Sequence, residues 1–117
     1  MHERSLVQTL IEQIDDELAR RGLQHLEEVR LEVGEFSGIE PLLMQVAFEE
    51  LAAGHWPQPV RLIWSTTPLT ARCLACRQEF EVERFRFICP ACEHRQVEIV
   101  GGEDIRLVSV RAETVLV

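Results

Sequence analysis

The sequence has no long hydrophobic run, no excess of positive charge and no cysteine outside one short stretch. Its apolar runs span only a few residues, whereas a helix that crosses a membrane needs about 20. The first residues also lack the basic and apolar regions of a secretory signal. We therefore expect a cytoplasmic protein without membrane attachment, in a compartment that keeps cysteines reduced.

The charge balance is acidic. The chain carries a formal net charge of −8, whereas a protein that holds nucleic acid phosphates needs a basic face. An acidic chain is better suited to cations or to basic protein surfaces. The sequence also lacks a nucleophile motif, a phosphate-binding loop and a pair of catalytic carboxylates. We therefore expect neither a nucleic-acid-binding protein nor an enzyme.

The apolar residues predict a small α+β fold. They recur at helical spacing in two segments and alternate in several others. The expected helices cover residues 4–21 and about 41–53, and the expected strands cover residues 28–36, 60–67, 79–82, 97–100 and 105–112. For the second helix we expect Glu40 near the N-cap and Pro41 in the first position. Its buried face is expected to consist of Leu43, Val46, Ala47 and Leu51, helped by Phe48.

This order of elements predicts a three-stranded sheet with two helices, into which a second module is inserted. The first domain is expected to consist of residues 1–68 and 101–117, and the inserted module of residues 69–100. The two short strands expected within the module are typical of a zinc ribbon. All the cysteines fall in this module.

The four cysteines form two Cys-x-x-Cys pairs, Cys73 with Cys76 and Cys89 with Cys92. Two such pairs facing each other supply a closed tetrahedron of thiolates, which is the usual surrounding of a structural zinc ion. Two disulfides would need an oxidising compartment, and a redox pair would need only one such motif. Iron in a rubredoxin-like site remains an alternative, because thiolates also suit iron.

The N-terminus offers a second set of metal ligands. The amine of Met1, the backbone amide of His2 once deprotonated, and the imidazole of His2 can form fused rings around one ion. The backbone amide or the carboxylate of Glu3 can complete a square, and square-planar ligation by nitrogen and oxygen favours Ni(II) or Cu(II). A histidine at position 2 is more often a solvated residue, so this motif alone is a weak signal.

Taken together, the motifs resemble the HypA/HybF family of hydrogenase maturation factors, which are nickel metallochaperones. The resemblance rests on the order of three motifs along nearly the whole chain: Met1-His2-Glu3 opening into a helix, the segment from Gly34 to Pro41 before a second helix, and Cys-x2-Cys-x12-Cys-x2-Cys.

The resemblance implies a nickel-binding α+β domain with an inserted zinc-binding module. Nickel is then expected at His2, with the Met1 amine and Glu3, and structural zinc at Cys73, Cys76, Cys89 and Cys92. An acidic residue near the start of the second helix is associated with nickel in some members, which makes Glu40 a further candidate. His94 lies close to the cysteines, but four thiols already complete a zinc shell.

The expected function is delivery of Ni(II) to a [NiFe]-hydrogenase large subunit precursor, with an accessory nickel-insertion GTPase as a partner. The chain itself is expected to be a monomer or a weak homodimer. The alternatives from other classes are a zinc-ribbon module for protein interactions and a rubredoxin-like iron electron carrier.

Overall fold

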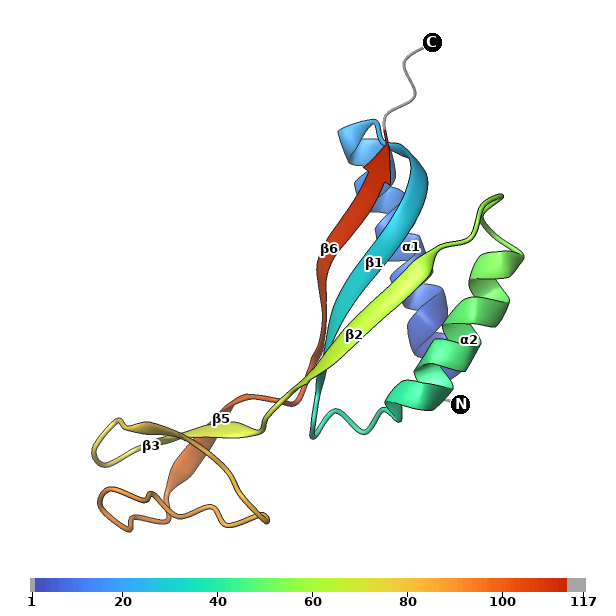
Figure 1. Cartoon of the computed structure of the whole chain (residues 1–117). Helices are drawn as coiled ribbons and strands as arrows, with labels where there is room; N and C mark the ends of the chain where they lie inside the picture. Colours follow the sequence, from blue (N-terminus) through green and yellow to red (C-terminus); the bar gives the residue numbers. More distant parts are fainter. Residues whose placement is uncertain (1, 114–117) are drawn as a thin grey trace. The chain divides into compact units, whose positions relative to one another are not determined.

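The computed structural model describes residues 2–113 and confirms the predicted α+β class (Figure 1). Two helices and six strands follow one another along the chain: α1 His2–Arg21, β1 Gln24–Gly34, α2 Pro41–Ala53, β2 Arg61–Thr67, β3 Thr70–Cys73, β4 Glu79–Glu81, β5 Val97–Gly101 and β6 Ile105–Glu113. All the predicted helices and strands are present. Strand β3 was not predicted, although Thr70-Ala71-Arg72-Cys73 alternates in burial.

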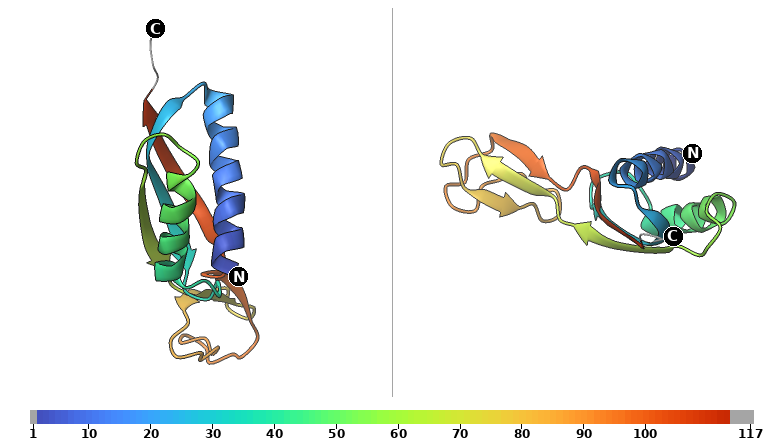
Figure 2. Two further views of the ribbon diagram at one scale, coloured as in Figure 1. Left: turned by 90° about the vertical axis from the view of Figure 1, so that its right-hand side faces the viewer. Right: turned by 90° about the horizontal axis from the view of Figure 1, so that it is seen from above.

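The first of two compact units contains residues 2–32, 39–65 and 106–113. Its sheet has the strand order β2-β1-β6, and both helices lie on one face of it (Figures 1 and 2). Helix α1 buries Val7, Leu10, Ile11 and Ile14 toward the core, as its periodicity predicts. No helix within residues 2–113 is long and apolar enough to cross a membrane.

The predicted buried face of helix α2 is confirmed at Ala47 and Phe48 and wrong at Leu43 and Val46. The buried residues are Met44, Ala47, Phe48 and Ala52, whereas the side chains of Leu43 and Val46 are both 52 % exposed. Helix α2 is apolar around most of its circumference, so hydrophobic periodicity could not select the face that packs on α1 and the sheet.

The second compact unit contains residues 33–38 and 66–105. Its antiparallel sheet has the order β4-β3-β5, with Ala71 of the central strand opposite Phe80 on one side and Ile99 on the other. Leu69, Ala71 and Val82 form a small buried core, covered by Phe80, Phe87, Val97 and Ile99. A core of this size stabilises little by itself, and the four cysteines lie in this unit.

Segment 33–38 is held to the rest of the second unit by backbone hydrogen bonds. The amides of Gly34, Glu35 and Phe36 donate to the carbonyls of Asp104, Thr67 and Gly102 at 2.8, 2.8 and 2.7 Å. Gly102 has φ +89, and a Cβ built on it would lie 2.4 Å from the carbonyl oxygen of Pro68. Only glycine fits where the chain passes this close to its own backbone.

Candidate metal centres

The two cysteine pairs are held by the same backbone pattern. In the first, the amide of Arg77 donates to the carbonyl of Cys73 and the amide of Cys73 donates to that of Gln78, each at 2.9 Å. In the second, the amide of Glu93 donates to the carbonyl of Cys89 at 2.8 Å, and the amide of Cys89 donates to that of His94 at 2.9 Å.

Each turn also contains a residue in the left-handed region at the same place. The φ angles are 68° at Arg77 and 65° at Glu93, each four residues after the first cysteine of its pair. This conformation reverses the chain tightly enough for both sulfurs of a pair to point into one space. The two turns are therefore equivalent, although their sequences share only the cysteines and an alanine.

The four sulfurs lie together. Sγ of Cys73 is 3.5 Å from Sγ of Cys92, Sγ of Cys76 is 3.6 Å from Sγ of Cys89, and all four lie within 4.8 Å of one another. A zinc ion with bonds of about 2.3 Å sets tetrahedral sulfurs about 3.8 Å apart. Since none of the four is in a disulfide, the donor set fits a single tetrahedral ion.

Two cysteines of this cluster have strongly displaced pKa values. The amide of Cys76 donates to the sulfur of Cys73 at 3.5 Å and is the main reason that the pKa of Cys73 is lowered to about 6. The amide of His94 lowers the pKa of Cys92. Burial and the neighbouring thiols, of which Cys73 has the largest effect, outweigh this and raise that pKa to about 12. Sulfurs this close repel one another when ionised, so a cation among them removes the conflict.

His94 contributes its backbone to this centre rather than its ring. Among the described residues, only the four cysteines form a group whose ligand atoms are close enough to share a metal ion. The carbonyl of His94 accepts the amide of Cys89, which closes the second turn.

The structure brings two of the expected nickel residues together at the start of helix α2. Glu3, only 9 % exposed, accepts the amide of Glu40 on its Oε2 at 3.2 Å. The side chain of Glu40 in turn accepts the amide of Leu42 at 3.2 Å, which confirms the predicted N-cap. The positive end of the α2 dipole favours both carboxylates here.

The remaining nickel candidates cannot be placed in the same way. Met1 and the side chain of His2 lie outside the described part of the structure, and His2 is the first residue of α1. No local motif predicts the contact between Glu3 and Glu40, because 37 positions separate them in the sequence.

Comparison with known proteins gives the family by sequence. A family profile described as hydrogenase/urease nickel incorporation, metallochaperone, HypA matches residues 1–112. The hydrogenase maturation factors HypA of Aquifex aeolicus and of Desulfitobacterium hafniense strain DCB-2 are 32 % and 34 % identical over 113 residues. These alignments cover 97 % of this chain in both cases, and 98 % and 99 % of the relatives.

Two solved structures share the fold. The solution structure of the Ni metallochaperone HypA from Helicobacter pylori superposes with a TM-score of 0.72 at 23 % identity, covering 95 % of this chain and 97 % of that one. A second solution structure of a HypA protein gives 0.76 at 24 % identity, with 97 % and 98 % covered. With a profile match and relatives of this identity over almost its whole length, the chain belongs to the HypA family of nickel metallochaperones in hydrogenase maturation.

Proposed function

We propose that this chain binds one Ni(II) ion through the Met1 amine, His2 and Glu3 and passes it to a [NiFe]-hydrogenase large subunit precursor. An accessory nickel-insertion GTPase assists the transfer, since the chain has no phosphate-binding loop of its own. The observation that carries the proposal is the match of residues 1–112 to a family of nickel-incorporation metallochaperones. The contact between Glu3 and the Glu40 amide supports it, because it fixes the chain one residue away from His2.

The structure favours the backbone amide of Glu3 over its carboxylate as the fourth ligand. The carboxylate is buried and already accepts the amide of Glu40. The first amides of a helix have no acceptor in the helix itself, and α1 begins at His2. Glu3 then has two roles: its amide binds nickel, and its carboxylate holds α1 against the N-cap of α2. Glu40 is a positioning residue in this arrangement.

We propose that zinc at Cys73, Cys76, Cys89 and Cys92 is structural. A zinc ion bound by four thiolates would have no open coordination position, and it would stabilise the two turns that hold it. The second unit needs this contribution because its own buried core consists of only three residues. We propose no catalytic residue.

The zinc site must keep its ion, whereas the nickel site must give its ion up. The difference between the two sets of ligands accounts for the release of nickel. A closed shell of four thiolates exchanges its ion slowly, whereas a chelate at the first residues of a chain can be opened one ligand at a time by a receiving protein. The nickel ligands must lose protons before they bind, so nickel affinity should fall as the pH falls. A cytoplasmic location remains a prediction from the sequence.

The nickel site is tested by calorimetry on zinc-loaded protein. We expect His2→Ala, or two residues added before Met1, to weaken nickel binding at least tenfold without changing the zinc content. His25→Ala is the matched control, because His25 is an exposed histidine of strand β1. Glu3→Gln keeps the backbone amide and a side-chain acceptor, so it should retain nickel within a few-fold. Unchanged nickel affinity in His2→Ala would refute the site.

Delivery is a separate step and needs its own experiment. Purified hydrogenase large subunit precursor is mixed with nickel-loaded wild-type chain or with His2→Ala at the same total nickel concentration. We expect faster nickel incorporation with the wild-type chain. Equal rates would show that free nickel supplies the precursor. Metal analysis also separates the alternatives, because an interaction module holds only zinc and an iron carrier is coloured and redox-active.

A further inference from the structure

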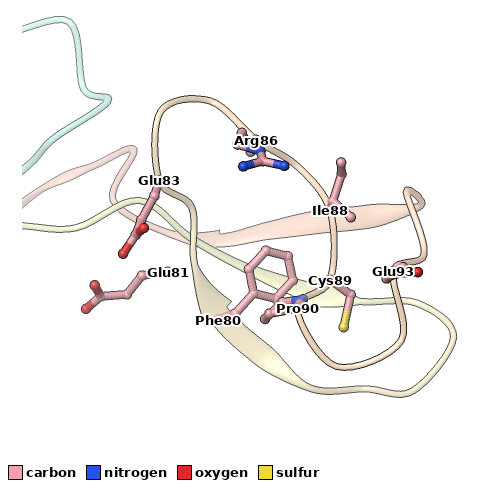
Figure 3. Close-up of a pocket in the computed structure, with 8 residues that line it drawn as sticks. All are labelled: Phe80, Glu81, Glu83, Arg86, Ile88, Cys89, Pro90 and Glu93. Atoms are coloured by element: carbon pink, nitrogen blue, oxygen red, sulfur yellow. The ribbon is translucent and has the colours of Figure 1, made fainter.

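The second unit contains a cavity that neither proposed metal site uses. Its volume is about 520 Å³, and it lies between strand β4 and the loop of residues 83–90 (Figure 3). Phe80, Ile88 and Pro90 provide apolar surface, and the ring of Phe80 lies in the space that the loop encloses. Cys89 also lines the cavity, but its sulfur belongs to the four-cysteine cluster. The volume of the cavity is large enough for one large apolar side chain.

Charged residues surround this apolar surface. Glu81, Glu83 and Glu93 contribute three carboxylates and Arg86 one guanidinium, which gives the lining a formal charge of −2. All four side chains are exposed, and within residues 2–113 none of them forms an ion pair or a side-chain hydrogen bond. In the same unit Arg72 is paired with both Glu79 and Glu98. The charges around the cavity are therefore available to a ligand.

The backbone of the loop is held in an unfavourable conformation. Arg84 and Phe85 both have positive φ, 53° and 59°, which is rare for residues with large side chains. The turn is closed by a hydrogen bond from the amide of Arg86 to the carbonyl of Glu83 at 3.0 Å. Conformations of this kind concentrate at ligand sites, where the surrounding structure maintains them.

The loop also exposes an aromatic side chain. Phe85 is 70 % exposed, and its only aromatic neighbour among the described residues is Phe36, which is itself 45 % exposed. The two rings meet edge to face with centroids 5.7 Å apart. Phe85 does not line the cavity, but it belongs to the loop of residues 83–90 that borders it, so the pair of exposed rings adds apolar surface near the cavity.

From these observations we infer that the cavity binds an extended peptide segment of a partner protein, in which one large apolar residue is flanked by lysine or arginine. The apolar residue enters the space around Phe80 and Ile88, and the flanking cations pair with Glu81, Glu83 and Glu93. Arg86 is placed to donate to a backbone carbonyl of the peptide. This inference extends beyond nickel delivery and does not require a bound nickel ion.

Other ligands fit the cavity less well. A divalent cation needs several carboxylate oxygens within a few ångströms of one another. Within residues 2–113 the one cluster of close ligand atoms consists of the four cysteine sulfurs, so the carboxylates of the cavity form no such group. A nucleic acid would be repelled by the net negative lining. A basic and apolar peptide satisfies both the charge and the apolar surface.

The test uses the zinc-loaded full chain and a labelled probe peptide, acetyl-Gly-Lys-Leu-Lys-Gly-amide, in fluorescence anisotropy at low salt. Two further peptides are controls, one with both lysines replaced by glutamate and one with the leucine replaced by serine. We expect the first peptide to bind more tightly than either control. Its contacts should shift the amide NMR signals of residues 79–93.

Matched protein variants separate a specific site from general attraction to an acidic protein. Glu81→Lys combined with Glu83→Lys should weaken binding about tenfold, since each exposed ion pair contributes up to a few-fold in affinity and the reversal adds repulsion. Glu103→Lys combined with Asp104→Lys is the control, because it reverses the same number of charges at exposed residues of this unit that do not line the cavity. It should change binding less than twofold. Zinc content confirms that each variant is folded.

Four outcomes would overturn the inference. They are no binding of the lysine peptide to the wild-type chain, equal binding of a control peptide, equal weakening by the Glu103→Lys, Asp104→Lys variant, and NMR shifts outside residues 79–93. Nickel titration of the Glu81→Lys, Glu83→Lys variant should give the wild-type affinity. Failure of the peptide site therefore leaves the nickel proposal intact.

Discussion

Replacing Gly102 by alanine should destabilise the second unit far more than the same change at Gly38. Both glycines lie in that unit and both have positive φ, +89° and +80°. A Cβ at Gly38 would have no atom within 4 Å, whereas one at Gly102 would lie 2.4 Å from the carbonyl oxygen of Pro68 and 2.6 Å from Cα of Leu69. The pair therefore isolates the steric overlap from the backbone strain.

The magnitudes follow from these two terms. Forcing a residue with a Cβ into a left-handed conformation costs about 1–2 kcal/mol, and Gly38→Ala should show only this. Gly102→Ala adds an overlap with backbone atoms that no side-chain rotation can relieve, worth a further ~1–3 kcal/mol. With a urea m-value of about 1–3 kcal/mol per M, the extra loss should lower the unfolding midpoint by about 1 M relative to Gly38→Ala.

Two probes follow the two units in one urea titration. Trp56 and Trp64, which are the only tryptophans, lie in the first unit, so their fluorescence reports its unfolding. Release of zinc to a coloured chelator reports the second unit. We expect Gly102→Ala to move the zinc-release midpoint more than Gly38→Ala does. Equal midpoints for the two variants would show that a Cβ at position 102 causes no costly overlap with Pro68 and Leu69.

Two further predictions concern the helix face and the thiols. Met44 is buried and Leu43 is exposed. In urea titrations followed by tryptophan fluorescence, Met44→Ala should therefore lower the free energy of unfolding by about 2–5 kcal/mol, whereas Leu43→Ser should change it by less than about 0.5 kcal/mol. A larger loss in Leu43→Ser would instead support the buried face predicted from the sequence. Zinc binding to the metal-free chain at pH 7 should release fewer than four protons in calorimetry, because the lowered pKa of Cys73, about 6, leaves that thiol ionised beforehand. As the pH falls through about 6, Cys73 takes up a proton that competes with zinc, so zinc affinity should fall. Release of all four protons at pH 7, or affinity independent of pH between 5 and 7, would contradict this.

The parts of the structure that depend on local sequence were predictable. Glu40 and Pro41 mark the start of α2 because an N-cap needs a side-chain acceptor and proline fits the first helical position. The spacing of the cysteines is likewise local, and the structure places all four sulfurs together. Val29, Leu31 and Val33 occupy alternate positions of β1 and are all buried, as the period of a strand predicts.

The parts that depend on distant contacts were not predictable. The burial of Glu3 depends on the amide of Glu40, and the sequence near residue 3 does not predict this contact. Strand β3 begins two residues after Pro68 and is only four residues long, so the sequence pattern does not predict it. The exposed Leu43 was assigned to the core because the pattern of α2 is apolar on several faces. Hydrophobic periodicity describes one element, whereas these features require knowing what the element packs against.

The close approach of Gly102 to Pro68 and Leu69 also indicates where insertions and deletions in this chain would be tolerated. The polypeptide enters and leaves the cysteine-bearing loop through one narrow neck, where residues 68 and 102 touch. Of the residues that receive the amides of segment 33–38, Thr67 and Asp104 lie outside the loop and Gly102 lies at the neck itself. Insertions, deletions or an exchanged loop between residues 69 and 101 would therefore leave these three acceptors in place. The neck therefore allows the cysteine-bearing loop to change in length without disturbing the contacts of segment 33–38.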